Sequence, residues 1–102
     1  MAISQKSADF LLQSRLADAD AGSIEALFEL GVTYSTGREG VGIDLIEAHK
    51  WFNLAALNGD TRSQACRADI SIEMTAREIA EAQRQARAWL GCHATEARRF
   101  AA

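Results

Sequence analysis

The sequence predicts an all-α protein with about five helices in a single domain. Its 102 residues suffice for one small domain with a modest core. Apolar residues recur with the 3.6-residue period of an α-helix, and the strict alternation that is typical of strands is absent. The chain contains no proline, so helix breaks must come from glycine and from polar turn residues.

The first two predicted helices extend from about residue 4 to 19 and from about residue 23 to 35. Asp18, Asp20 and Gly22 separate them. In the first helix, the apolar residues that we place on or near one face are Phe10, Leu12, Leu16 and Ala19. In the second helix, the apolar residues follow the helical period and are Ile24, Leu27, Phe28, Leu30, Gly31 and Tyr34.

The main loop, residues 36–42, has three glycines in seven residues, which permit backbone conformations with positive φ. A phosphate-binding loop would need a strand before it and a Lys-Ser or Lys-Thr pair after it, and the sequence has neither here. Asp44 and Glu47 then have the spacing of a capping box, which predicts a third helix to about Asn58. Its apolar surface comprises Leu45, Ala48, Trp51, Phe52, Ala55 and Ala56.

Gly59 is predicted to end the third helix, and Asp60 or Thr61 to cap a fourth that extends to about residue 73. Thr75 and Glu78 form a second capping box at the start of a fifth helix. The inner face of this helix comprises Ile79, Ala82, Ala86, Trp89 and Leu90.

Gly91 is predicted to stop the fifth helix. Residues 92–102 are then expected to form a loose or short helical tail.

An internal repeat relates two parts of the chain. Ala19-x-x-Gly22 recurs as Ala56-x-x-Gly59, an offset of 37 residues that suits a helix–turn–helix repeat. The residues between the two glycines include Leu30-Gly31-x-x-Tyr34, Gly40-Val41, Asp44, Ala48-x-x-Trp51 and Ala55-Ala56-x-x-Gly59. In these motifs the chain resembles the Sel-one-like repeat (SLR) family, a helical-repeat family related to the tetratricopeptide repeats.

The resemblance implies a short α-solenoid with a right-handed superhelix and one full repeat. It would place the full repeat at 22–59, an N-terminal helix or cap at 1–21, a C-terminal half-repeat and capping helix at 60–91, and a tail at 92–102. The segment after Gly59 looks like the closing segment of bacterial members. The structural motif residues would be Gly22, Ala26, Leu30, Gly31, Tyr34, Gly37, Gly40, Asp44, Ala48, Trp51, Ala55, Ala56 and Gly59.

The loop of the repeat departs from the family pattern. Residues 37–41 contain one residue more than the usual Gly-x-Gly-Val. We expect the longer loop to leave the flanking helices undisturbed.

The resemblance also implies where binding would occur. In helix-pair solenoids the first helix of each pair lines a concave surface. Applying the repeat offset, we expect this surface to include Glu25, Phe28, Glu29, Val32, Ser35, Arg62, Cys66 and Asp69. Phe28 and Val32 would form an apolar spot beside carboxylates, which is typical of interaction sites; alternatively, the first helix covers Phe28.

These expectations favour an adaptor or scaffold that binds an unidentified protein or peptide, without a cofactor and without enzymatic activity. A self-assembling homodimer is the alternative, because solenoids need about three repeats for stability and this chain has fewer. A metal-binding protein or small enzyme is more remote.

Charge and composition narrow the partners. The net charge of −3 and pI of about 5.3 argue against nucleic acid, whose backbone requires a basic surface. The sequence shows neither a signal peptide nor an apolar run that could span a bilayer, so we expect no membrane insertion. With two cysteines far apart, Cys66 and Cys92, a cytoplasmic protein with free thiols is the simplest interpretation.

The remaining chemical candidates are weak. His49 has no ligand partner at helical spacing, so we expect a solvated surface histidine. Cys92 and His93 are adjacent, and their side chains would not converge unless Cys66 approached them in an adventitious metal site. We therefore predict no catalytic residue and no metal.

Overall fold

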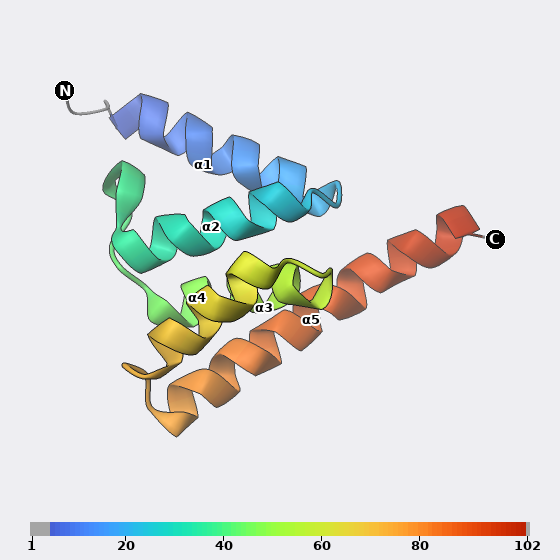
Figure 1. Ribbon diagram of the computed structural model, residues 1–102. Coiled ribbons are helices and arrows are strands. Elements are labelled where there is room, and N and C mark those ends of the chain that lie inside the picture. The colour runs from blue at the N-terminus through green and yellow to red at the C-terminus, as the bar shows by residue number, and fades with distance from the viewer. Residues whose placement is uncertain (1–4, 102) are drawn as a thin grey trace.

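The computed structural model describes residues 5–101, with 94–101 described as backbone only. It contains five α-helices and a short 3-10 helix, and none of residues 5–101 lies in a strand (Figure 1). The elements are α1 (Gln5–Asp20), α2 (Ile24–Thr36), η1 (Arg38–Gly40), α3 (Leu45–Leu57), α4 (Thr61–Ser71) and α5 (Ala76–Ala101). The prediction of an all-α chain with about five helices is confirmed.

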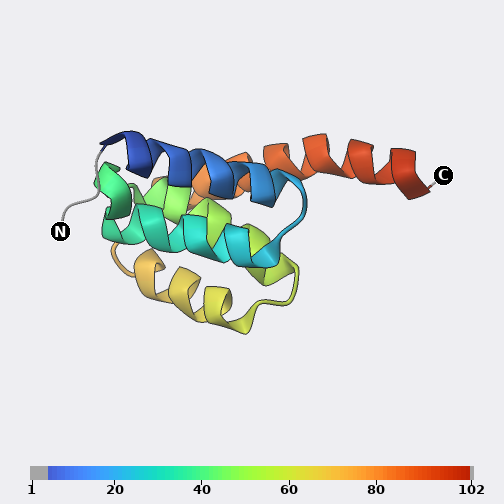
Figure 2. The same ribbon diagram turned by 90° about the horizontal axis from the view of Figure 1, so that it is seen from above.

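Helix α3 lies at the centre of the molecule. It packs against α2, α4 and α5, while α1 packs on α2. Successive helices run in opposite directions, and the C-terminal turns of α5 project beyond the other helices (Figures 1 and 2). Within residues 5–101, no helix has both the length and the apolar character needed to cross a membrane.

The core joins residues from α1, α2, α3 and α5, and half of its members are alanine. Small side chains let the helices approach closely, and each fully buried leucine contributes about 1.5–3 kcal/mol. The Trp51 ring of α3 meets the Trp89 ring of α5 edge-on, with 6.2 Å between centroids. The buried residues of this cluster are Ala19, Ala26, Leu27, Leu30, Trp51, Leu54, Ala55 and Ala86.

Gly31 shows why the contact between α2 and α3 requires a residue without a side chain. A Cβ atom at this position would lie 2.4 Å from the Phe52 ring. Gly37 has a different role, since it ends α2 in the left-handed conformation with φ of 75°. Two glycines of the repeat motif, Gly31 and Gly37, therefore have structural roles.

Polar caps begin three of the later helices where the sequence indicated. Asp60, rather than Thr61, caps α4 by accepting a hydrogen bond from the Ser63 amide. Thr75 and Glu78 form a reciprocal capping box before α5.

The capping box predicted at α3 is only half formed. Asp44 accepts from the Glu47 amide, but the Glu47 carboxylate accepts from Lys50 and from the Trp51 indole. The Asp44 amide donates instead to the Tyr34 carbonyl of α2.

The longer loop has a structural use. Glu39 adopts φ of 58°, which is uncommon for a residue with a side chain, and its carboxylate accepts from Arg15 of α1 at 2.5 Å and 2.6 Å. Arg15 also donates to the Thr33 hydroxyl of α2. The loop thus places a carboxylate that ties α1 to the rest of the chain.

Two predictions about the helices are wrong. Gly91 does not end α5, which continues through residues 92–101. One glycine in a helix interior costs about 1 kcal/mol, too little to stop a helix flanked by good helix formers. Phe10 does not share the buried face of α1, because 72% of it is exposed. The predicted start of α1 at Ser4 lies outside the described residues.

Candidate interaction surface

The eight residues predicted to bind a partner lie on α2 and α4, which contact each other. We call this surface the α2–α4 face. Glu25, Arg62 and Asp69 are exposed on it, whereas the other five residues are partly buried: Phe28, Glu29, Val32, Ser35 and Cys66. The face therefore combines exposed charge with half-covered apolar and small polar groups.

Arg62 organises one end of the α2–α4 face. Its guanidinium lies over the Phe28 ring, 4.0 Å from the centroid, and donates to Glu25 at 2.7 Å and to Asp60 at 3.1 Å. Hydrogen bonds from Arg62 to Glu25 and Asp60 raise the pKa of the guanidinium. Three of the predicted residues thus form one cluster, together with the cap of α4.

The Phe28 ring is partly buried. One side of the ring meets Phe52 of α3, with centroids 6.0 Å apart, and Arg62 of α4 lies over the ring. Groups from α3 and α4 thus cover part of the ring. Val32 is partly buried, and its carbonyl accepts hydrogen bonds from Ser35 and Thr36.

Cys66 lies between carboxylates on the same face. Its burial raises the pKa of the thiol, and the negative charges of Asp69 and Asp60 raise it further. The thiol therefore stays protonated at neutral pH, which makes it a poor nucleophile.

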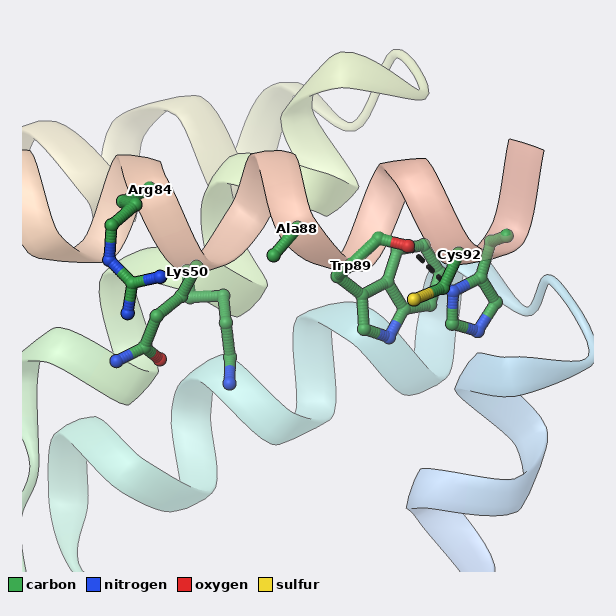
Figure 3. Close-up of a pocket in the computed structure, with 7 residues that line it drawn as sticks. Lys50, Arg84, Ala88, Trp89 and Cys92 are labelled. Atoms are coloured by element: carbon green, nitrogen blue, oxygen red, sulfur yellow. Dashed lines mark hydrogen bonds between the residues drawn. The ribbon is translucent and has the colours of Figure 1, made fainter. Parts of the chain in front are cut away.

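A shallow depression between α3 and α5 is a second candidate, which the sequence did not suggest. Its volume is about 350 Å³, and Figure 3 shows Lys50 from α3 near Arg84 from α5. Both cations already have carboxylate partners, at 2.9 Å for Lys50 with Glu47 and 2.5 Å for Arg84 with Glu81. The lining residues are Lys50, Arg84, Gln85, Ala88, Trp89, Cys92 and His93. Arg84, Ala88 and Cys92 recur at four-residue intervals, which is the signal that could have located this surface.

His93 closes one end of this depression. The imidazole stacks on the Trp89 indole, with 3.5 Å between ring centroids, and its Nδ1 lies 2.8 Å from the Trp89 carbonyl. Its Nε2 lies 3.1 Å from an Asp20 carboxylate oxygen of α1. His93 thus links α5 to α1, and the Cys92 beside it in the sequence is an exposed free thiol.

His49 is not the solvated surface residue that we predicted. It is 3% exposed on α3, and its Nδ1 has no hydrogen-bond partner within the described part of the chain. Burial lowers the pKa of the imidazole, and the charge of Arg67 lowers it further. The residue is therefore a neutral core histidine at physiological pH.

The described side chains were also compared with the requirements of a metal site. Among the described residues, no three of the His, Cys, Asp and Glu side chains are placed to do so. Both cysteines are free thiols.

Comparisons with known proteins identified no relative of this chain. No protein-family model matches the chain, and searches of curated proteins and of solved structures found no match.

Proposed function

We propose that this protein is a small helical-repeat adaptor that binds a protein or peptide on the α2–α4 face. The observation that carries this proposal is the ion pair between Glu25 and Arg62, whose charged atoms are 2.7 Å apart and whose positions are 37 residues apart. This separation equals the offset of the sequence repeat. Equivalent positions of consecutive repeats lie side by side in helix-pair solenoids, so the contact supports an SLR-like solenoid.

The chemistry of the α2–α4 face supports binding rather than catalysis. The face offers exposed carboxylates, one guanidinium and a half-buried aromatic ring, a mixture that is typical of interaction surfaces. Its thiol has a raised pKa, whereas a catalytic thiol needs a lowered one. We place this function in the cytoplasm, whose reducing conditions suit the free thiols of Cys66 and Cys92.

Site-specific photo-crosslinking in the source cell tests the proposal. A benzophenone amino acid is introduced at Asp69 and, as a matched control, at Gln64. Both residues are exposed on α4, and five positions along a helix turn them about 140° apart. We expect a crosslinked partner from position 69 and none from position 64. The same adducts from both positions, or none from either, would overturn the proposal.

Self-assembly is the second candidate function, and the projecting end of α5 favours it. The last turns of this helix extend beyond the other four helices (Figure 1). A second copy that packs there would bury an otherwise isolated helix end. Light scattering after size-exclusion chromatography decides the matter: the adaptor proposal expects the monomer mass of 11.1 kDa at micromolar concentration, and self-assembly expects twice that mass.

A further inference from the structure

Arg62 occupies a receptor that two helices build for a guanidinium group. Phe28 of α2 supplies an aromatic face, Glu25 of α2 supplies one carboxylate, and Asp60 before α4 supplies another. A planar cation gains both stacking and directional hydrogen bonds in such a site, which favours arginine over lysine. The chain's own side chain therefore shows which ligand chemistry this site takes.

Two of the three receptor groups, Phe28 and Asp60, have contacts that do not involve Arg62. The Phe28 ring packs on Phe52 of α3. The Asp60 carboxylate accepts hydrogen bonds from the Ser63 amide, at 3.1 Å, and from the Ser63 hydroxyl. The hydrogen bond from the Ser63 hydroxyl is the largest cause that lowers the pKa of Asp60, so the carboxylate remains charged at neutral pH. The Phe28 ring and the charged Asp60 carboxylate would thus stay in place without Arg62.

Arg62 itself is an exchangeable occupant. Its side chain and that of Glu25 are about half exposed or more, and exposed ion pairs contribute little to stability. Holding a long arginine side chain in one rotamer also costs entropy. A competing arginine can therefore displace Arg62 into solvent without disturbing the core.

The charge of the surrounding surface favours a cationic ligand. Asp60 and Asp69 both act electrostatically on Cys66, which places their carboxylates around one part of the α2–α4 face. In the cluster itself, the two carboxylates of Glu25 and Asp60 stand against the single guanidinium of Arg62. Removal of Arg62 from the receptor leaves negative charge that an incoming cation would balance.

We propose that the partner presents an arginine side chain that displaces Arg62, stacks on Phe28 and pairs with Glu25 and Asp60. The inference rests on the binding function proposed above and adds the chemistry of the partner. Arg62 then acts as an internal competitor. It lowers the apparent affinity for the partner, because only the molecules with an empty receptor can bind.

NMR titration with N-acetylarginine amide tests this inference on the whole chain. The variant Arg62→Ser opens the receptor, and we expect it to bind at least about tenfold more tightly than the unaltered protein. The shifts should centre on Phe28 and on the Ser63 amide. N-acetylcitrulline amide has the same shape without the charge and should not bind, and N-acetyllysine amide should bind more weakly.

A second variant guards against misfolding. The double variant Arg62→Ser, Phe28→Leu keeps an apolar side chain against Phe52 but removes the aromatic face. It should fold, which circular dichroism checks. It should not show the tighter binding of N-acetylarginine amide that we expect for Arg62→Ser alone. Equal affinity in the Arg62→Ser and unaltered proteins, or equal binding of citrulline, would overturn the inference. A crosslinked partner at position 69 would in that case leave the adaptor function standing, with another partner chemistry.

Discussion

Among the side chains that the structure describes, two arginine–glutamate pairs join helices, and they differ in burial. Arg15 of α1 and Glu39 of η1 have side chains that are 22% and 7% exposed, whereas the values for Arg62 of α4 and Glu25 of α2 are 49% and 63%. The separations are similar, at 2.5 Å and 2.7 Å. What differs is the access of water to the charges when the pair opens.

This difference assigns the two pairs separate roles. If the buried pair opens, Glu39 loses its partner where water reaches it poorly, and a buried unpaired charge is costly. If the exposed pair opens, both charges are hydrated at once. We therefore expect the first pair to hold α1 on the molecule and the second to be free to exchange with a ligand.

The largest expected effect comes from breaking the buried pair. Glu39→Ala should lower the free energy of unfolding by about 2 kcal/mol, because it leaves the half-buried Arg15 guanidinium without its carboxylate. Urea denaturation measures the change. Glu39→Gly should lower the free energy of unfolding by only about 1 kcal/mol, because glycine adopts φ of 58° without strain.

Arg38→Ala is the matched control, since this residue is exposed in the same turn. We expect its effect to be within about 0.5 kcal/mol. If Glu39→Ala unfolded at the same urea concentration as Arg38→Ala, burial of the pair would not govern its contribution.

His49 extends the comparison to a buried group without a charged partner. Its folded-state pKa is lowered, first by burial, so the unfolded chain binds more protons below the ordinary value of 6.5. Stability contributed by the neutral imidazole is complete above pH 6.5 and is lost as the pH falls toward the folded-state pKa. The loss is at most about 1.4 kcal/mol per pH unit.

His49→Met removes the titrating group from the core but keeps a large side chain. Urea unfolding at several pH values should show that stability falls between neutral and mildly acidic pH in the unaltered protein, and falls less in the variant. Parallel pH profiles for the two chains would contradict a buried, neutral His49.

Breaking the exposed pair should have a smaller effect. We expect Arg62→Gln to keep the melting temperature within about 2 °C of the unaltered value. In 1 M salt, where the Debye length is about 3 Å, even this difference should vanish, while the effect of Glu39→Ala should persist. A large, salt-independent destabilisation would make Arg62 a structural clasp and would argue against an exchangeable occupant.

The features predicted from the sequence are those that short segments decide. The caps at Asp60 and Thr75 depend on residues three positions away, and both are found. The repeat offset placed Glu25 and Arg62 at equivalent positions, although it did not predict that they would pair. The Arg15–Glu39 pair had no local signal, because 24 residues separate its members; the extra loop residue was its only trace.

The errors have a physical cause as well. His49 was expected at the surface because the sequence offers it no ligand partner at helical spacing, but a histidine without a ligand can also lie in the core. Helix α3 is packed by α2, α4 and α5, so seven of its thirteen residues are buried, and helical period alone cannot identify its exposed side. Gly91 was overvalued as a stop signal because glycine ends a helix only where flanking residues do not favour its continuation.

The smallest effect on stability is expected at a surface pair within one turn of α5, Arg84 and Glu81. Hydrogen bonds from Arg84, and then from Gln85, lower the pKa of Glu81 from 4.5 to about 2. The contribution of the ionised carboxylate to stability is present above pH 4.5 and is lost as the pH falls toward 2, and it is small because solvent screens the pair. Arg84→Gln should raise the pKa of Glu81 toward 4.5 in an NMR titration and leave thermal stability at neutral pH unchanged within error. If the variant instead melted far below the unaltered chain, exposed pairs would stabilise this fold as buried ones do, and the contrast between Arg15 and Arg62 would lose its basis.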